Sequence, residues 1–372
     1  MLVSFATGIG LQVKIREKIA AFNGHITIEN YDNNSSQVSL VPVSINQDFY
    51  PEFTSVSGIS HIQAVATKAG IIRTETDFEG VIMKGVGTDY KWENFDEFLV
   101  EGQLPDYSKN INEDIIISRY LANRLGFEVG DKVITFFLRE DPSRPPWSRG
   151  FVVKGIYDSG FQEFDELYFL GDIRHIRRMN NWEDDQVGSF EVFIDDFDKL
   201  DQKGMEVYEN TDSLLDSRTI QQTYYSIFEW LSLFDFNIAL IIGIMILVAG
   251  INMITALLVL ILERTQMIGI LKALGGGDWT IRKIFLYNAG YLILLGLFWG
   301  NLIGLGLLFI QKYFKLFPLN PETYYVTEVP VYIGWEYILA VNIGTLLLCL
   351  LMLLIPSIII TRISPVKAMK FD

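Results

Sequence analysis

Three long stretches without a charged residue constrain this chain more than any other feature of its sequence. They are Phe236–Leu262 and Ile284–Ile310, with 27 residues each, and Tyr337–Ile360, with 24. Because a helix rises about 1.5 Å per residue, about 20 apolar residues suffice to cross a hydrocarbon core about 30 Å thick. We therefore expect three membrane-spanning helices, which excludes a fully soluble enzyme.

The N-terminal segment 1–13 is also apolar and uncharged, but it is too short to span a bilayer. It lacks the basic start and the small-residue cleavage site of a signal peptide. We expect it to be the outer half of a truncated first transmembrane helix, with a short buried N-terminal helix as the alternative. The sequence leaves open whether this shortening is real or reflects the gene start.

Charge is divided unevenly along the chain. Residues 12–235 carry 21 Lys+Arg and 39 Asp+Glu, a net charge of −18, whereas residues 236–372 carry 9 and 6. The acidic part is therefore expected to lie in water. The chain has no concentrated basic face, which excludes a nucleic-acid binder. A single cysteine, Cys349, rules out a disulfide within the chain.

The distribution of Lys and Arg in the short loops predicts the orientation in the membrane, because such residues are enriched in cytoplasmic loops. Loop 263–283 has four of them and the tail 361–372 has three, whereas loop 311–336 has two beside three glutamates. We expect the following order: a partial span 1–13, an extracytoplasmic domain 14–235, spans 236–262, 284–310 and 337–360, a cytoplasmic loop 263–283, an extracytoplasmic loop 311–336 and a cytoplasmic tail 361–372.

The acidic region alternates strand and helix patterns. Strand-like runs occur at 24–29, 80–85, 114–118, 132–138, 151–157 and 190–194, and helical patterns occur at 118–125 and 199–208. Amphipathic spacing at 11–19 and 220–234 predicts a stalk helix at each end, with ordinary helices packed on the domain as the alternative. The expected fold class is thus an α-helical membrane protein with four spans, the first truncated, and a large α+β extracytoplasmic domain between spans 1 and 2.

A Pro- and Arg-rich segment, 139–150, lies between two of the expected strands. Proline stiffens an extended or turn conformation without a sheet around it. We interpret Pro145, Pro146 and Trp147 as a contact loop for a partner protein, and a long hairpin connection is the alternative.

Patterns that carry chemistry are missing from the sequence. His25, His61 and His175 have no metal-ligand spacing, and the glycines at 275–277 are not followed by the Gly-Lys-Ser/Thr of a phosphate-binding loop. We therefore expect no catalytic residue, no metal site and no cofactor site. If ATP drives this protein, another polypeptide binds it.

Small and polar residues inside the spans predict helix packing. Gly296, Gly300 and Gly304 form a doubled GxxxG pattern that lets another helix approach closely, within the bundle or between subunits. Asn252 and Asn301 favour an interhelical hydrogen bond over a transport role. No span contains an acid or a base, which argues against a proton- or sodium-coupled carrier.

The stretch 251–288, INMITALLVLILERTQMIGILKALGGGDWTIRKIFLYN, resembles the FtsX-like permeases of MacB-type ABC transporters, and the ending 363–371, ISPVKAMKF, is similar to that family's tail. The segments 15–28, 121–131 and 151–170 resemble most closely the LolC/LolE permeases of the lipoprotein-releasing complex. The layout of one span, a large outer domain and three further spans is similar too.

This resemblance implies a subunit without enzymatic activity in the bacterial inner membrane, with its large domain in the periplasm. It implies a cytoplasmic ABC ATPase partner that binds ATP and docks on loop 263–283. There, four apolar side chains would insert into a groove of the ATPase and three charged ones would orient it. The apolar residues are Ile268, Ile270, Leu271 and Leu274, and the charged ones are Glu263, Arg264 and Lys272.

The resemblance also implies a second permease copy or a paralogue, contact with membrane lipids, a lipoprotein cargo and a periplasmic carrier protein. In LolC-like proteins the carrier contacts a loop at the position that Pro142–Arg149 holds here. For a lipid-anchored cargo we expect an apolar wall of Leu2, Phe5, Phe236 and Leu240.

The leading hypothesis is therefore a permease that extracts lipoproteins from the inner membrane. The alternative is MacB/FtsX-like mechanotransmission, in which stalk movement drives efflux or a cell-wall hydrolase and nothing crosses the bilayer. A third possibility is a membrane-anchored sensor without an ATPase.

Overall fold

The long uncharged runs of the sequence form the helices of one structural unit, and the acidic region forms a sheet in another. The computed structural model describes residues 1–34, 36–139 and 143–358. The helical unit comprises Met1–Lys14, Glu229–Leu319 and the chain from Glu328 onward; the sheet unit comprises Ile15–Phe228 and Asn320–Thr327. Pro142, the last two residues of the expected fourth span and the tail 361–372 lie outside the described residues.

Three helices in the described part of the chain are long and apolar enough to cross a membrane: α7 (Tyr225–Glu263), α9 (Asp278–Phe314) and α11 (Trp335–Ser357). Helix α7 has 39 residues, about 58 Å at 1.5 Å per residue, so it continues well beyond a bilayer core. The expected stalk before the second span is thus the start of α7 itself. Helix α1 (Leu2–Asn23) is continuous through both the apolar start and the charged segment after it.

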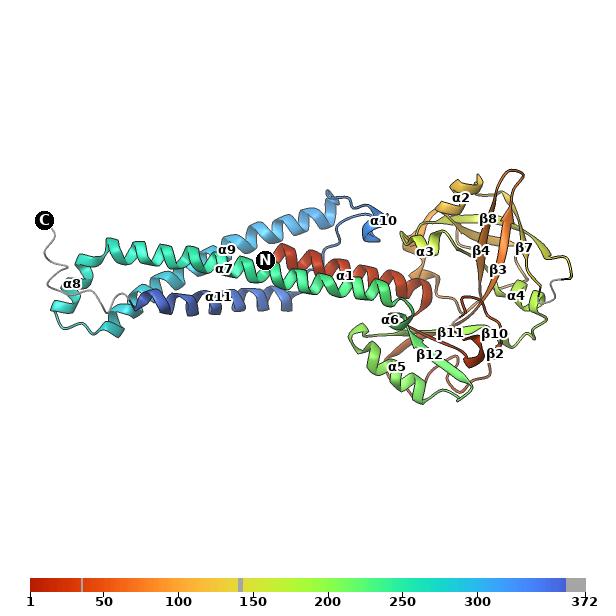
Figure 1. Cartoon of the computed structure of the whole chain (residues 1–372), viewed down its shortest axis with the longest axis horizontal. Coiled ribbons are helices and arrows are strands. Elements are labelled where there is room, and N and C mark those ends of the chain that lie inside the picture. The colour runs from red at the N-terminus through yellow and green to blue at the C-terminus, as the bar shows by residue number, and fades with distance from the viewer. Residues whose placement is uncertain (35, 140–142, 359–372) are drawn as a thin grey trace. The chain divides into compact units, whose positions relative to one another are not determined.

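The core of the helical unit lies where α7, α9 and α11 pack together near α8 (Thr265–Ala273), at one end of the bundle (Figure 1). It contains Leu257 and Ile261 from α7, Phe285 from α9 and Leu353 from α11, all at most 3% exposed. Asn301 of α9 and Asn342 of α11 exchange amide hydrogen bonds of 2.6 and 3.1 Å. This pair is the interhelical contact expected of Asn301, whereas Asn252 lies exposed.

The sheet unit contains short helices and, among the described residues, a ten-stranded sheet beside a small two-stranded one. Its strands are β1 (Ile26–Asn30), β2 (Val43–Ser44), β3 (Ile59–Arg73), β4 (Phe78–Val86), β5 (Leu99–Gly102), β6 (Asp114–Ser118), β7 (Lys132–Phe137), β8 (Trp147–Tyr157), β9 (Tyr168–Asp172), β10 (Gln186–Val187), β11 (Ser189–Ile194) and β12 (Leu215–Thr219). Its helices include α2 (Arg119–Leu125), α3 (Gln162–Asp165), α4 (Ile173–Asn180), α5 (Leu200–Glu209), α6 (Ile220–Thr223) and α10 (Pro321–Tyr324).

Strand β3 belongs to two parts of this sheet. Its first half pairs with β11, which continues to β1 and β12. Its second half pairs with β4 and β7, and the path β3–β4–β9–β6–β8–β7 returns to β3, so these strands close into a barrel. Every strand-like run expected from the sequence overlaps one of these strands, whereas β2, β3, β5, β9, β10 and β12 were not expected.

Local signals explain where the helices begin and end. The hydroxyl of Ser118 accepts a hydrogen bond from the Leu121 amide at the start of α2, and Gly126, at φ +73°, ends that helix in the left-handed region. In the predicted stalk of α1, Leu11, Ile15 and Ile19 are buried, as their spacing indicates.

Candidate functional site

The expected ATPase-docking loop contains helix α8, which follows Glu263 and Arg264 at the end of α7. The apolar side chains of this loop point in two directions. Ile268 is fully buried in the core of the helical unit, and Leu271 packs against the same core. Both side chains contribute to the bundle interior, so the surface available to a partner is narrower than the sequence suggested.

The outward side of this loop consists of Ile270 and Leu274, which are 47% and 81% exposed, together with Met267 and Trp279. Lys272 forms an ion pair of 2.8 Å with Asp278 at the start of α9, which fixes α8 to the next helix. Sequence reasoning missed Met267 and Trp279. A signal for Trp279 was available in the sequence, because this large apolar residue lies at the start of α9, close in the chain to the apolar residues of α8.

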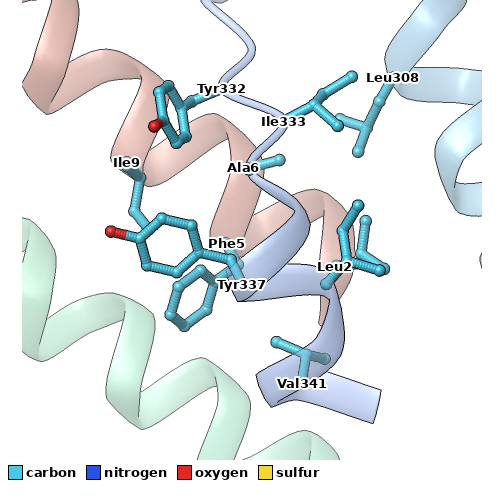
Figure 2. Close-up of a pocket in the computed structure, with 11 residues that line it drawn as sticks. Leu2, Phe5, Ala6, Ile9, Leu308, Tyr332, Ile333, Tyr337 and Val341 are labelled. Carbon is cyan, nitrogen blue, oxygen red and sulfur yellow. The ribbon is translucent and has the colours of Figure 1, made fainter.

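An apolar crevice lies in the helical unit between α1, α9 and α11 (Figure 2). Leu2 and Phe5 line it, and the ring of Phe5 lies 5.5 Å from that of Tyr337 on α11. Its free volume is about 10 Å³, about enough for one water, so side chains close it in this conformation. Phe236 and Leu240, the other two residues of the expected wall, lie exposed on α7 instead.

The glycines of the doubled GxxxG pattern lie on an open face of α9. A Cβ added at Gly296, Gly300 or Gly304 would meet no atom of the described chain within 4 Å. By contrast, a Cβ at Gly250 of α7 would collide with the side chain of Met352 on α11. Close approaches inside the helical unit occur at Gly250 and at Gly8 and Gly10 of α1, and no described part of this chain covers the GxxxG face.

In the sheet unit, the expected contact loop is part of the hairpin between β7 and β8. Pro145 and Pro146 are exposed, and Trp147 is the first residue of β8. The guanidinium groups of Arg139 and Arg149 lie 3.8 and 5.6 Å from the centre of the Trp147 ring. These cation–π contacts hold the indole in place rather than leaving it free to rotate.

The end of α1 is fixed to the sheet by a buried ion pair. Lys84 of β4 and Glu191 of β11 are 2.6 Å apart and nearly inaccessible to solvent. The Lys84 ammonium also donates to the carbonyl of Phe22, and Gln63 donates to Glu191 at 2.8 Å. A lysine at this place satisfies a carbonyl that the last turn of a helix leaves unpaired. Sequence reasoning missed this pair, because both residues lie inside strand patterns.

Burial shifts the pKa values of several groups of the sheet unit, among them His25 and Asp165. Burial lowers the pKa of His25 to about 4, and its Nδ1 accepts a hydrogen bond from the Ile194 amide at 3.2 Å. Burial raises the pKa of Asp165 to about 6, although hydrogen bonds from Ser159 oppose the shift. Among the described residues, no group of three His, Cys, Asp or Glu could hold a metal ion.

These features define a membrane protein with a helical bundle and a large mixed α/β domain. Residues 239–365 match the FtsX-like permease C-terminal family. LolC, the lipoprotein-releasing system transmembrane protein, is 21% identical in Xylella fastidiosa strain 9a5c over 276 residues, 70% of this chain and 65% of that protein. LolC of Neisseria meningitidis serogroup B is 23% identical over 324 residues, 83% of this chain and 76% of that protein.

The C-terminal part of the chain, residues 239–365, is thus similar to FtsX-like permeases, and LolC proteins are similar to most of the chain, as the resemblance of 251–288 indicated. It spans slightly less than two thirds of the length of the Xylella relatives. The extracellular domain of the noncanonic ABC-type transporter YknZ from Gram-positive bacteria aligns with 52% of this chain at 12% identity and a TM-score of 0.35, too weak a likeness to add to the argument. Permeases of this family are transmembrane subunits without catalytic activity of their own.

Proposed function

We propose that this chain is the permease subunit of an ABC transporter that extracts lipoproteins from the bacterial inner membrane, using ATP hydrolysed by a partner subunit. The observation that carries the proposal is the match of residues 239–365 to FtsX-like permeases, on a bundle whose α8 loop presents an exposed apolar ridge. LolC relatives at 21–24% identity favour lipoproteins as the cargo.

The ATPase docks on the outward side of the α8 loop. Ile270 and Leu274 supply the apolar contact, Trp279 extends it, and Glu263 and Arg264 lie at the junction with α7. An exposed apolar ridge on a short helix suits a groove in a partner, because burying it releases ordered water from both surfaces. Lys272 is engaged with Asp278, so its part is to hold α8 against α9.

A second permease, a copy or a paralogue, covers the uncovered glycine face of α9. Small residues at Gly296, Gly300 and Gly304 allow backbones to approach closely, which is how helices associate where lipid removes the hydrophobic driving force. The cargo's acyl chains enter beside Leu2 and Phe5 once the crevice opens, and a periplasmic carrier contacts Pro145, Pro146 and Trp147.

The test is purification of the full chain from its native host in mild detergent, followed by mass spectrometry of the proteins that accompany it. We expect an ATPase and acylated lipoproteins. A Leu274→Asp variant should lose the ATPase, whereas Leu214→Asp, a similarly exposed leucine of the sheet unit, should retain it. Retention of the ATPase by Leu274→Asp would refute the docking site.

The alternative function is MacB/FtsX-like mechanotransmission. The continuous helix α1 and the 39-residue α7 favour it, since each carries a membrane-facing sequence into the sheet unit without a break. An ATPase recovered with a hydrolase or an outer-channel adaptor, and without lipoproteins, would decide for this alternative. Recovery of no ATPase at all would reject both functions in favour of a sensor.

A further inference from the structure

The chain passes between the helical unit and the sheet unit four times: after Lys14, after Phe228, after Leu319 and after Thr327. Within the sheet unit, three segments adjoin these crossings. They are the second half of α1, the α6–α7 junction, and the segment 320–327 that lies between α9 and α11. One segment of the sheet unit, Asp158–Asp165, touches all three; it consists of a loop and the short helix α3 (Gln162–Asp165), and we call it the hub loop.

Two aromatic residues of the hub loop make most of these contacts. Phe22 of α1 stacks on Phe164 with 4.5 Å between ring centroids, and Tyr224, just before α7, meets Phe164 edge-on at 5.5 Å. Tyr325, in the segment between α9 and α11, stacks on Phe161 at 4.7 Å. Phe161 and Phe164 are themselves 5.4 Å apart, so the rings form one continuous cluster.

The hub loop holds its shape through its own hydrogen bonds. The carboxylate of Asp165 accepts from the amide and hydroxyl of Ser159, at 3.1 and 2.7 Å, and from the amide of Gly160 at 3.1 Å. The hydroxyl of Tyr157 donates to the Phe164 carbonyl at 3.2 Å, which fixes the loop to β8. The conformation of the hub loop is therefore fixed by its own hydrogen bonds and does not depend only on packing against the three segments.

Polar contacts reinforce two of the connections. The Lys18 ammonium of α1 donates to the carbonyls of Ser159 and Tyr325, at 2.8 and 3.3 Å, and so links α1, the hub loop and the segment 320–327. Tyr325 has φ +58°, a left-handed conformation that usually belongs to glycine after a helix. An aromatic residue at such a strained position is accounted for by the stacking of its ring on Phe161.

We propose that the hub loop is the part of the sheet unit that receives movement from all the membrane helices together, with Phe161, Phe164 and Asp165 as positioning residues. This inference rests on the proposed function, in which an ATPase moves those helices. A rigid aromatic cluster suits the task, because packed rings resist sliding and respond to displacement of any one connection. The three connections thereby act on one body instead of on separate strands.

The test uses the full chain in lipid nanodiscs and hydrogen exchange of its backbone amides. Tyr325→Gly removes the ring and also relieves the backbone, so it spares the fold where Phe164→Ala could unfold the sheet unit. Without nucleotide, we expect the backbone amides of 320–327 in Tyr325→Gly to exchange about 2- to 13-fold faster than in the parent chain, the factor that corresponds to the free energy of one aromatic contact. Exchange should also be faster in 158–165 and in 18–23. Tyr325→Phe, which keeps the ring, and Phe78→Ala, a 72% exposed aromatic residue, should match the parent chain.

Faster exchange confined to 320–327 would overturn the inference, because the connections would then be independent. With the co-purified ATPase, ATP and vanadate should change exchange across the sheet unit of the parent chain, and Tyr325→Gly should lose this response while the ATPase remains bound. A retained response would also overturn the inference. If the parent chain binds no ATPase, the proposed function fails, and the nucleotide-free result still decides whether the hub loop joins the three connections.

Discussion

Acidification of the sheet unit protonates two buried groups whose effects on stability oppose each other. The pKa of His25 is about 4 in the folded chain against 6.5 in the unfolded chain. Its contribution to the stability of the fold is therefore present above pH 6.5 and is lost as the pH falls toward 4. The pKa of Asp165 is about 6 against 3.8, so its contribution is present below pH 3.8 and is lost as the pH rises through 6.

The magnitudes follow from about 1.4 kcal/mol for each unit of pKa difference. Between pH 7 and pH 5, His25 alone lowers the free energy of unfolding by about 2 kcal/mol, and Asp165 alone raises it by about 1.4 kcal/mol. The two nearly cancel in the parent chain. The loss at His25 comes from burial, which penalises the charged imidazole, and a proton on Nδ1 would also face the Ile194 amide, from which Nδ1 now accepts a hydrogen bond.

Single substitutions should reveal each contribution. From pH 7 to pH 5, the free energy of unfolding of Asp165→Asn should fall by about 1.4 kcal/mol more than that of the parent chain. The free energy of unfolding of His25→Asn should fall by about 2 kcal/mol less than that of the parent chain. The amide oxygen of that asparagine can still accept from the Ile194 amide. Urea unfolding of the full chain in nanodiscs, followed by tryptophan fluorescence at each pH, measures both differences. Identical pH profiles for the parent and both variants would refute the assigned burial.

Three further outcomes follow from contacts described above. Asn301→Leu should destabilise the helical unit by about 1 kcal/mol, as measured by steric trapping, and adding Asn342→Leu should restore part of the loss because no lone amide remains. Lys84→Met should lower the urea midpoint by the equivalent of about 3–5 kcal/mol, since Glu191 keeps an unpaired buried charge, whereas a Lys84→Met/Glu191→Leu double variant should lose less. Ile268→Ala should cost about 2–5 kcal/mol in detergent unfolding, and an unchanged transition would show that its side chain is not in the core.

Periodicity predicted much of the secondary structure. The helical pattern at 118–125 agrees with α2 except at its first residue, because the Ser118 side chain caps the helix instead of belonging to it. The uncharged runs predicted the membrane helices for an equally direct reason, as a charge at the bilayer centre is costly. Strand β3 was not predicted, because its 15 residues belong to both a barrel and an open sheet. No single alternation of apolar and polar residues therefore describes the whole strand.

The candidate site was less predictable than the fold. Spacing shows that Ile268, Ile270 and Leu271 are apolar residues on a short helix, but it cannot show which of them a neighbouring helix covers. The hub loop was not expected at all, although the segment that contains it carried the family resemblance. Its partners Phe22 and Tyr325 are more than 300 residues apart in the chain, and only the tertiary fold brings both to Phe161–Phe164.

The continuity of β3 restricts how this domain can vary. Side chains alternate between the two faces of a strand, so inserting one residue near Val65, between the stretch paired with β11 and the stretch paired with β7, would reverse the parity of one half against the other. Every inward side chain of that half would then point outward. The barrel and the open sheet therefore cannot change length independently through this strand, and tolerated insertions should fall in pairs of residues or in the loops.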